Sequence, residues 1–458
     1  MRLPCPADAP GLTWTRARAY RSAMRMRLHI PNRRTFRRWL AGAALFGATA
    51  LPAAAQLVEG PDWTLAYSLP SQTLKAKWPG EYAVSDLLVA QVGQLRKGDR
   101  AELATFTLGG LLPRTGGGAP LLKAMDKALG RGASIHFVAD SGIALTNTFL
   151  WGLSLDGLSR RPYNPLTLSV SPPDPLMHHK TAIFDYGEGE KWTFVGSGNF
   201  TAAANNRQWN VGLLIRNPDL HAAYAAEMAE FRAGRFGAAK GRGHDGAVFR
   251  PADSWGECWV RFGPPLPATT GVVNAEAQIR ELIHGAEEEI SFAMHRFNRP
   301  SLRRALVAAA DRGVRVRGVI PVSDRSRARG AVSRGTVEFF ADPANYKTTN
   351  RVVLLPARVR ANGDGWDAGE ADLVHLKYAL IDPNGSRPVL IHGAANWTEA
   401  GLSKPDGNDE SILFLRHAGI ARAFLEQFRR MTEAPPATSA DEPSPEPPSE
   451  PAATSPAA

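Results

Sequence analysis

The chain has 458 residues, with 54 Lys and Arg against 44 Asp and Glu, and only two cysteines. This length allows two or three domains, the apolar content of 44% excludes wholesale disorder, and two cysteines exclude a disulfide framework or a thiolate zinc site. The net charge of +10 lies mostly at the start, because residues 1–55 carry +9 and residues 434–458 carry −4, which leaves about +5 on residues 56–433.

The first 55 residues have the pattern of an export signal. Residues 33–38 are rich in arginine, residues 39–51 are apolar, and Ala53-Ala54-Ala55 provides the small residues of a cleavage site before Gln56. The apolar run is short for a membrane span. The arginine pair also resembles a twin-arginine signal. We therefore expect residues 1–55 to be a signal peptide and the mature protein to be periplasmic or secreted, with an uncleaved anchor as the alternative.

Two stretches of the body share one order of predicted elements. Each has an apolar strand, an amphipathic helix and a second strand, which are 102–108, 120–132 and 133–140 in the first stretch and 289–294, 300–313 and 314–320 in the second. A strand–helix–strand unit implies that its two strands pair in parallel. The repeated order predicts an internal duplication within residues 56–433.

A more specific block follows in each stretch, beginning at His178 and at His375. In both blocks Lys follows the His by two positions, Asp by seven, Gly by 18 and Asn by 21. A single His-x-Lys carries no information, but five matching positions that occur twice at identical spacing are not expected by chance. The flanking residues are apolar, so each block predicts a buried strand followed by a turn and a returning strand.

The strand period orders these side chains. A period of two places His178 and Lys180 on one face, and the same holds for the second block. Asp185 and Asp382 stand at an odd offset and point away from that face, so we interpret them as orienting or structural groups. Two imidazoles, two ammonium groups and two amides around one point suit a phosphoryl group whose negative charge grows in the transition state.

Such a set predicts phosphodiester cleavage without a metal ion or other cofactor. One neutral His attacks phosphorus while the other, protonated, gives its proton to the leaving alcohol, and water then hydrolyses the phosphohistidine. No carboxylate cluster or Cys/His cluster in the sequence suggests a metal site.

The two blocks resemble the duplicated H-x-K-x4-D and G-S-x-N signature of the phospholipase D superfamily, over roughly residues 60–432. The resemblance implies an α/β fold in which two phospholipase D-like halves, residues 56–245 and 246–433, pack as an αβαβα sandwich with pseudo-two-fold symmetry. It implies an active site at the seam, with His178 as nucleophile and His375 as general acid. The implied catalytic set is His178, Lys180, Asp185, His375, Lys377 and Asp382, with Ser197, Asn199 and Asn396 binding the phosphate.

Two departures from the family pattern affect this assignment. Ala394 replaces the serine that Ser197 provides in the first block. The family also places an acid downstream of each Asn to orient a motif His; Glu410 fits this role in the second half, but Asn210 stands at the corresponding place in the first. An amide can fix a tautomer but cannot stabilise an imidazolium as a carboxylate does. The choice of nucleophile between the two histidines stays open at this point.

Other features have simpler interpretations. The acidic run 363–372 is read as a solvated loop rather than a calcium loop, and the Gly-rich segment 238–247 as the hinge between halves. Residues 146–176 are a candidate substrate-selecting lid, with packing on the sandwich as an equal alternative. Cys258 is expected to be a buried thiol. The Pro- and Ser-rich tail 434–458 is expected to be disordered.

The leading interpretation is an exported monomeric hydrolase that cleaves the head-group phosphodiester of a glycerophospholipid at a membrane surface. A secreted nuclease with the same histidines is the second interpretation, although the small charge of the body gives it little support. A cardiolipin synthase would fit the motifs, but the N-terminal membrane helices typical of such enzymes are absent from the sequence. An inactive phosphate- or lipid-binding relative is the third interpretation.

Overall fold

A computed structural model describes the chain at residues 56–68, 83–109, 118–141, 155–201, 204, 208–241, 248–249, 257–265, 273–321, 332–357, 359–360, 366–367 and 374–433. The predicted signal peptide, the predicted tail, residues 242–247 of the hinge and most of the acidic run 363–372 lie outside these residues, as does the first part of the candidate lid. Both predicted halves belong to a single compact unit.

Two eight-stranded sheets form the framework, and their strand orders correspond position by position. The first sheet runs β1 (Gln56–Glu59), β2 (Trp63–Tyr67), β10 (Val211–Arg216), β8 (Lys191–Gly196), β7 (Lys180–Asp185), β3 (Arg100–Thr105), β5 (Ser134–Ala139) and β6 (Thr167–Val170). The second runs β11 (Val248–Phe249), β12 (Cys258–Phe262), β20 (Ser411–Leu415), β19 (Val389–Gly393), β18 (Lys377–Ile381), β13 (Glu289–Met294), β14 (Arg315–Val319) and β15 (Val353–Leu354). Two small ladders pair β4 (Leu108–Gly109) with β9 (Phe200–Thr201) and β16 (Val359–Arg360) with β17 (Trp366–Asp367).

The pairing confirms the predicted duplication. β3 and β5 are parallel, as are β13 and β14, so each strand–helix–strand unit forms as expected. The motif strand of each half, β7 or β18, then pairs antiparallel with β3 or β13 on one side and with the returning strand β8 or β19 on the other. The motif strands therefore lie near the centre of their sheets, where their buried apolar residues require them to be.

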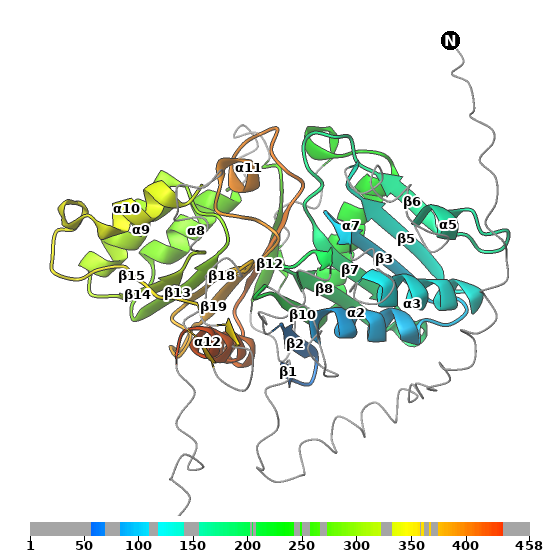
Figure 1. The fold of residues 1–458 in the computed structure, drawn as a ribbon, viewed down its shortest axis with the longest axis horizontal. Helices are drawn as coiled ribbons and strands as arrows, with labels where there is room; N and C mark the ends of the chain where they lie inside the picture. Colours follow the sequence, from blue (N-terminus) through cyan, green and yellow to red (C-terminus); the bar gives the residue numbers. More distant parts are fainter. Residues whose placement is uncertain are drawn as a thin grey trace, which may run out of the picture. The chain divides into compact units, whose positions relative to one another are not determined.

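Helices cover both sheets. The helices of the described residues are α2 (Ala83–Gln94), α3 (Gly118–Gly130), α5 (Leu155–Ser159), α7 (Pro218–Arg232), α8 (Ala275–His284), α9 (Pro300–Asp311), α10 (Arg334–Ala341), α11 (Glu399–Leu402) and α12 (Ala418–Thr432). Figure 1 shows α2 and α3 against the first sheet and α8 and α9 against the second. None of these helices combines the length and hydrophobicity that a membrane span needs.

Three apolar cores hold these layers together. One core joins α2 and α3 to the first sheet, and another joins α8 and α9 to the second. The third core contains residues of both sheets together with the inner faces of α7 and α12, so these two helices lie in the layer between the sheets. Each of the two begins with a cap, because Asn217 accepts from the Leu220 N–H and His417 from the Ile420 N–H. This is the αβαβα sandwich that the resemblance implied.

Candidate active site

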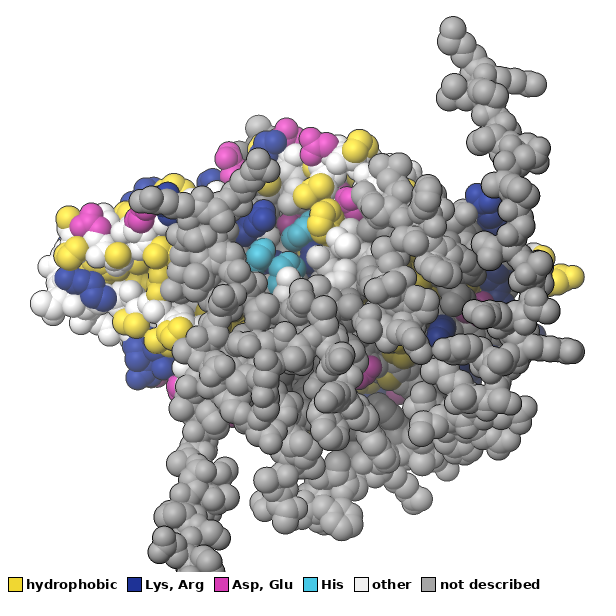
Figure 2. Space-filling view, in the orientation of Figure 1, with side chains coloured by type: hydrophobic (Ala, Val, Ile, Leu, Met, Phe, Trp, Pro, Cys, Tyr) yellow, Lys and Arg dark blue, Asp and Glu magenta, His cyan; other side chains and the backbone are white. Residues whose placement is uncertain are grey.

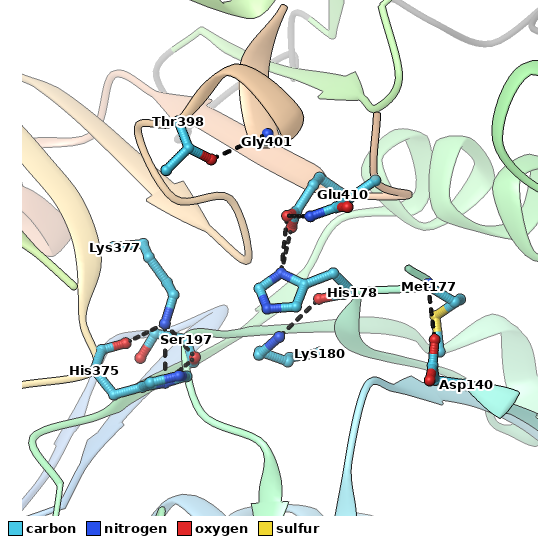
Figure 3. Close-up of polar contacts among 11 residues, drawn as sticks. Asp140, Met177, His178, Lys180, Ser197, His375, Lys377, Thr398, Gly401 and Glu410 are labelled. Atoms are coloured by element: carbon cyan, nitrogen blue, oxygen red, sulfur yellow. Dashed lines mark hydrogen bonds and ion pairs between the residues drawn. The ribbon is translucent and has the colours of Figure 1, made fainter. Parts of the chain in front are cut away.

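The backbone of each half positions the motif histidine of the other. The segments that lead into β7 and β18 leave their own sheets and form parallel bridges across the seam. The His178 N–H donates to the Asp409 carbonyl at 2.9 Å, and the His375 N–H donates to the Trp209 carbonyl at 3.0 Å. The two sets of motif residues, predicted from separate halves of the chain, are therefore brought together at the seam, and Figure 3 shows both histidines in one view.

The His178 ring is held by a carboxylate of the second half. Its Nδ1 lies 2.8 Å and 2.9 Å from the two Glu410 carboxylate oxygens. Because a carboxylate accepts, Nδ1 carries the proton and Nε2 keeps its lone pair. Burial, followed by the charges of Lys180 and Lys377, lowers the pKa of His178 well below its usual value, and burial raises the pKa of Glu410 to about 7. The pair thus presents a neutral imidazole with a free Nε2.

The His375 ring has an amide partner from the first half instead. Its Nδ1 lies 3.0 Å from the Ser197 carbonyl and 3.2 Å from the Asn210 Oδ1. The Asn210 Nδ2 donates to the Ala204 carbonyl at 2.7 Å, which turns the amide oxygen toward the histidine and the Ser197 hydroxyl. Burial and the charge of Lys377 hold the pKa of His375 well below its usual value. The Lys377 Nζ also lies 2.9 Å from the same Nδ1, so this site supplies no counter-charge to an imidazolium and places a cation beside it.

The two motif lysines supply positive charge at the centre. Each Nζ donates to the carbonyl of its own motif histidine, at 2.7 Å for Lys180 and 2.6 Å for Lys377. Both side chains are buried, and this burial lowers the pKa of Lys180 to about 7 and that of Lys377 well below its usual value. Within the described residues neither ammonium group pairs with a carboxylate. A bound phosphodiester anion would provide the missing negative charge.

The two motif asparagines also keep hydrogen-bonding capacity. The Oδ1 atoms of Asn199 and Asn396 are buried, and neither has a hydrogen-bond partner among the residues that the structure describes. Ser197 does not offer its hydroxyl in the same way, because its Oγ donates to the Asn210 Oδ1 at 3.0 Å. Its role is to orient Asn210, and Ala394 at the matching place leaves the second half without this contact.

Asp185 and Asp382 lie at the far ends of the motif strands. Each Asp stands five positions after its lysine, so the Cα atoms of the two residues lie about 16 Å apart along the strand. Asp382 accepts from the backbone N–H groups of Glu287, Glu288 and Glu289 at 2.8 to 3.0 Å, and Asp185 pairs with Lys191 at 2.8 Å. These contacts are structural, which corrects the inclusion of Asp185 and Asp382 in the catalytic set implied by the resemblance. They agree with the strand period, which predicted that both side chains point away from the face of the histidines and lysines.

The structure adds residues at the site that the sequence analysis did not single out. Phe106 and His295 follow β3 and β13, and they lie beside the two motif histidines, with ring centroids 5.2 Å from His178 and 4.5 Å from His375. Asp140 follows β5, and its carboxylate accepts from the Met177 N–H at 3.1 Å, just before His178. Only His295 directly follows a predicted strand, the one at 289–294; Phe106 and Asp140 lie inside the predicted strands 102–108 and 133–140, so no sequence signal pointed to them.

A buried ion network next to the site connects the two halves. The Lys240 Nζ lies 2.5 Å from Glu227 and 2.8 Å from Asp409, and it donates to the Gly263 carbonyl at 2.6 Å. Burial alone would lower the pKa of Lys240, but Glu227 and Asp409 raise it. Because Asp409 precedes Glu410 and its carbonyl accepts from the His178 N–H, this network holds the backbone next to the His178–Glu410 pair.

The site is largely buried, and solvent reaches it at a few side chains, which include the half-buried Asn199 and Asn396. His178 and His375 are each 8% exposed, whereas Glu410 and Lys180 have no exposed surface. Figure 2 shows histidine side chains in a hollow with Lys or Arg side chains next to them. Nowhere in the described part of the chain do three or more potential metal ligands cluster. A neutral His178 Nε2, two lysines and a second histidine form a site that can attack and hold a phosphodiester.

Comparison with known proteins finds one family model that matches both halves of the chain. Residues 99–232 and 279–432 match the family model described as "Cardiolipin synthase, PLD-like domain". The mitochondrial cardiolipin hydrolases of Canis lupus familiaris and Mus musculus are each 27% identical to this chain, over 174 and 175 residues. These alignments cover 37% of this chain and 57% and 66% of the two relatives, so less than two thirds of either relative is matched.

The fold has a counterpart among solved structures. Phosphatidylserine synthase from Haemophilus influenzae Rd KW20 superposes with a TM-score of 0.55 at 12% identity, over 76% of this chain and 84% of that one. At this identity the likeness concerns the fold alone. It extends over both halves and agrees with the paired sheets described above.

Proposed function

The chain belongs to the phospholipase D-like family described as cardiolipin synthase, PLD-like domain, and from this premise we propose that it hydrolyses the head-group phosphodiester of glycerophospholipids. The observation that carries the proposal is the His178–Glu410 pair across the seam, which faces a second histidine and two buried lysines. The two relatives named cardiolipin hydrolases support a lipid substrate, with cardiolipin as one candidate.

The first step is attack by the His178 Nε2 on phosphorus. As the N–P bond forms, positive charge grows on the ring, and the Glu410 carboxylate stabilises this charge through the Nδ1 hydrogen bond. The bond from phosphorus to the leaving oxygen breaks, and His375 in its protonated form gives that oxygen its proton. Lys180 and Lys377 offset the negative charge on the phosphoryl oxygens.

The second step restores the enzyme. A water molecule attacks the phosphohistidine, and His375, now neutral, accepts its proton. The N–P bond breaks, the lipid phosphate leaves, and His178 returns to the neutral form. Because the pKa of His375 is low in the empty site, the negative charge of the bound substrate is what allows this ring to be protonated in the first step.

We also propose that the mature protein acts as a monomer at a membrane surface after export. The arginine-rich and apolar segments of residues 33–55 support export. N-terminal sequencing of the protein recovered from the periplasmic or culture fraction tests this, and an intact segment before Gln56 would contradict it.

A single panel of substrates tests the function. The purified protein is offered vesicles of phosphatidylcholine, phosphatidylglycerol and cardiolipin, together with supercoiled DNA and bis(p-nitrophenyl) phosphate, all with EDTA present. We expect head-group release that the variants His178→Asn and His375→Asn abolish. Nicked DNA without lipid cleavage would show a nuclease instead, and no cleavage of any substrate would show an inactive binding protein.

A further inference from the structure

The two halves differ at the residues that follow β3 and β13, beside the motif histidines. The Phe106 N–H donates to the His179 carbonyl at 3.0 Å, and the His295 N–H donates to the Leu376 carbonyl at 2.8 Å. Each acceptor is the residue after the motif histidine. Phe106 and His295 therefore occupy equivalent positions, one apolar and one polar.

The next position differs in charge. The Thr107 carbonyl accepts from the Phe200 N–H, and the Arg296 carbonyl accepts from the Trp397 N–H, both at 3.0 Å. Phe200 and Trp397 directly follow the two motif asparagines. Arg296 thus stands between the segment of His375 and that of Asn396, where the first half has an uncharged threonine.

The Arg296 side chain is exposed, and no hydrogen bond or ion pair in the described residues engages its guanidinium. It is nevertheless close to the reacting groups. Burial is the main cause of the low pKa values of His178 and His295, and the charge of Arg296 lowers both further. An exposed, unpaired guanidinium at the edge of a phosphate site is available to a second anionic group.

His295 does not supply a second charge here. Its Nδ1 lies 3.0 Å from the Val374 carbonyl, which can only accept, so this nitrogen carries the proton. Its pKa is lowered well below the usual value, mainly by burial. The ring is therefore neutral and lies against His375, so it adds no charge to those of the buried Lys377 and the exposed Arg296.

The position of Arg296 determines which part of the substrate it meets. In an in-line displacement the leaving oxygen lies opposite the attacking atom. With His178 as nucleophile, the leaving alcohol points toward His375. Arg296 directly follows His295, whose ring centroid lies 4.5 Å from that of His375, so a charge on the leaving alcohol is within the field of Arg296.

We propose that Arg296 forms an anion subsite for the leaving alcohol, so that the preferred substrates are phospholipids whose leaving alcohol carries a further phosphate. This inference rests on the proposed function and deepens it. A positively charged head group such as choline is disfavoured at the same place. A nucleic acid would call for a row of cations along its backbone, whereas the body of the chain carries only about +5.

The activity test uses two lipids that differ by one phosphate. Phosphatidylglycerol loses uncharged glycerol, and phosphatidylglycerol phosphate loses glycerol phosphate. We expect the ratio of kcat/KM for the phosphorylated lipid to that for phosphatidylglycerol to fall roughly 10- to 100-fold in Arg296→Thr, the residue of the first half. Arg296→Lys keeps part of the ratio, and Arg334→Thr, an exposed arginine of α10, keeps all of it.

A binding test does not depend on turnover. Calorimetry compares glycerol 1,3-bisphosphate, which can fill the phosphate site and the subsite together, with glycerol 3-phosphate, which can fill only one. We expect the gain in affinity from the second phosphate to be lost in Arg296→Thr. Comparing the two ligands in each protein cancels any change in the central phosphate site.

The outcomes separate the two proposals. If the wild-type protein cleaves neither of these lipids nor any lipid of the substrate panel, the proposed function fails and the binding test alone decides on the subsite. An equal loss for both lipids, or an unchanged gain from the second phosphate, would overturn the subsite. If Arg296→Thr lowered only the rate of cleavage of single-stranded DNA, the proposed lipid substrate would be wrong and a nucleic acid would be favoured.

Discussion

The two halves of the molecule share one backbone plan and give their motif histidines different partners. Their sheets have the same strand order, and each half sends the backbone before its motif strand across the seam. His178 receives the Glu410 carboxylate, whereas His375 receives the Asn210 amide. The two halves therefore share the strand order of their sheets and differ in the side chains that hold the motif histidines.

A carboxylate and an amide differ most in their effect when an imidazole becomes positively charged. Nucleophilic attack puts that charge on the attacking ring for the lifetime of the intermediate, so the carboxylate-paired His178 is suited to it. His375 only has to hold a proton while substrate is bound and then give it up, and its low pKa favours the release. In the proposed mechanism, this difference between the halves matches the two roles of nucleophile and general acid.

The residues before these partners differ as well. Asp409 lies in the buried ion network with Lys240 and Glu227, whereas Trp209 at the matching place is fully buried within the apolar core. In the second half, ion pairs therefore fix the residue before Glu410. In the first half, apolar packing fixes the residue before Asn210. Four predictions test how far this division extends.

The first prediction concerns the two histidines. We expect His178→Asn and His375→Asn each to lower kcat on lipid by about 10⁴-fold or more, because each removes a group that acts on the reacting atoms. With bis(p-nitrophenyl) phosphate the leaving group needs no proton, so His375→Asn should still form the covalent adduct and accumulate it. Intact-mass analysis and peptide mapping locate the adduct. An adduct on His375 in the wild-type protein would reverse the assignment.

The second prediction concerns the carboxylate. Glu410→Gln keeps the shape but removes the charge, and we expect kcat to fall by about 10²- to 10⁴-fold. The pKa of Glu410 is raised to about 7 by burial, so the carboxylate is lost as pH falls below this value. The acid limb of the wild-type pH profile should therefore disappear in the variant. An unchanged acid limb would assign it to another group, and Glu338→Gln on α10 is the matched control.

The third prediction concerns the buried ion network. Lys240→Met leaves Glu227 and Asp409 buried without their cation, and we expect the free energy of unfolding to fall by about 3–5 kcal/mol. The control is Lys191→Met, because Lys191 pairs with Asp185 in a half-exposed position and should change stability by less than about 1 kcal/mol. Urea denaturation measures both. Equal losses in the two variants would show that the network is no stronger than a surface pair.

The fourth prediction restores the missing carboxylate. Asn210→Asp places a negative charge next to His375, which favours the protonated ring and raises its pKa. Since His375 must be protonated to act as the general acid, the alkaline limb of the kcat/KM profile should move to higher pH. Asn210→Ala provides no charge and should not move it upward. An alkaline limb that stays in place in Asn210→Asp would mean that another group governs it.

Local patterns in the sequence predicted much of the fold. The strand–helix–strand units, the two motif strands and the buried Cys258 follow from periodicity and apolar content, which act over a few neighbouring residues. The same period of two placed Asp185 and Asp382 away from the histidine–lysine face. The resemblance, which rests on the duplicated motif, implied the sandwich and included these two aspartates in the catalytic set, and their strand-end contacts correct the latter.

Local spacing along the chain was enough to predict the duplication, the residue types of the motif and their alternation along each strand. The contacts of Glu410 with His178 and of Asn210 with His375 become visible only in the folded molecule, because the first joins residues 232 positions apart in the chain and the second joins residues 165 positions apart. The same is true of Arg296 and Lys240. Contacts of this kind depend on how two layers pack against each other, and that packing leaves no periodic trace in either segment alone.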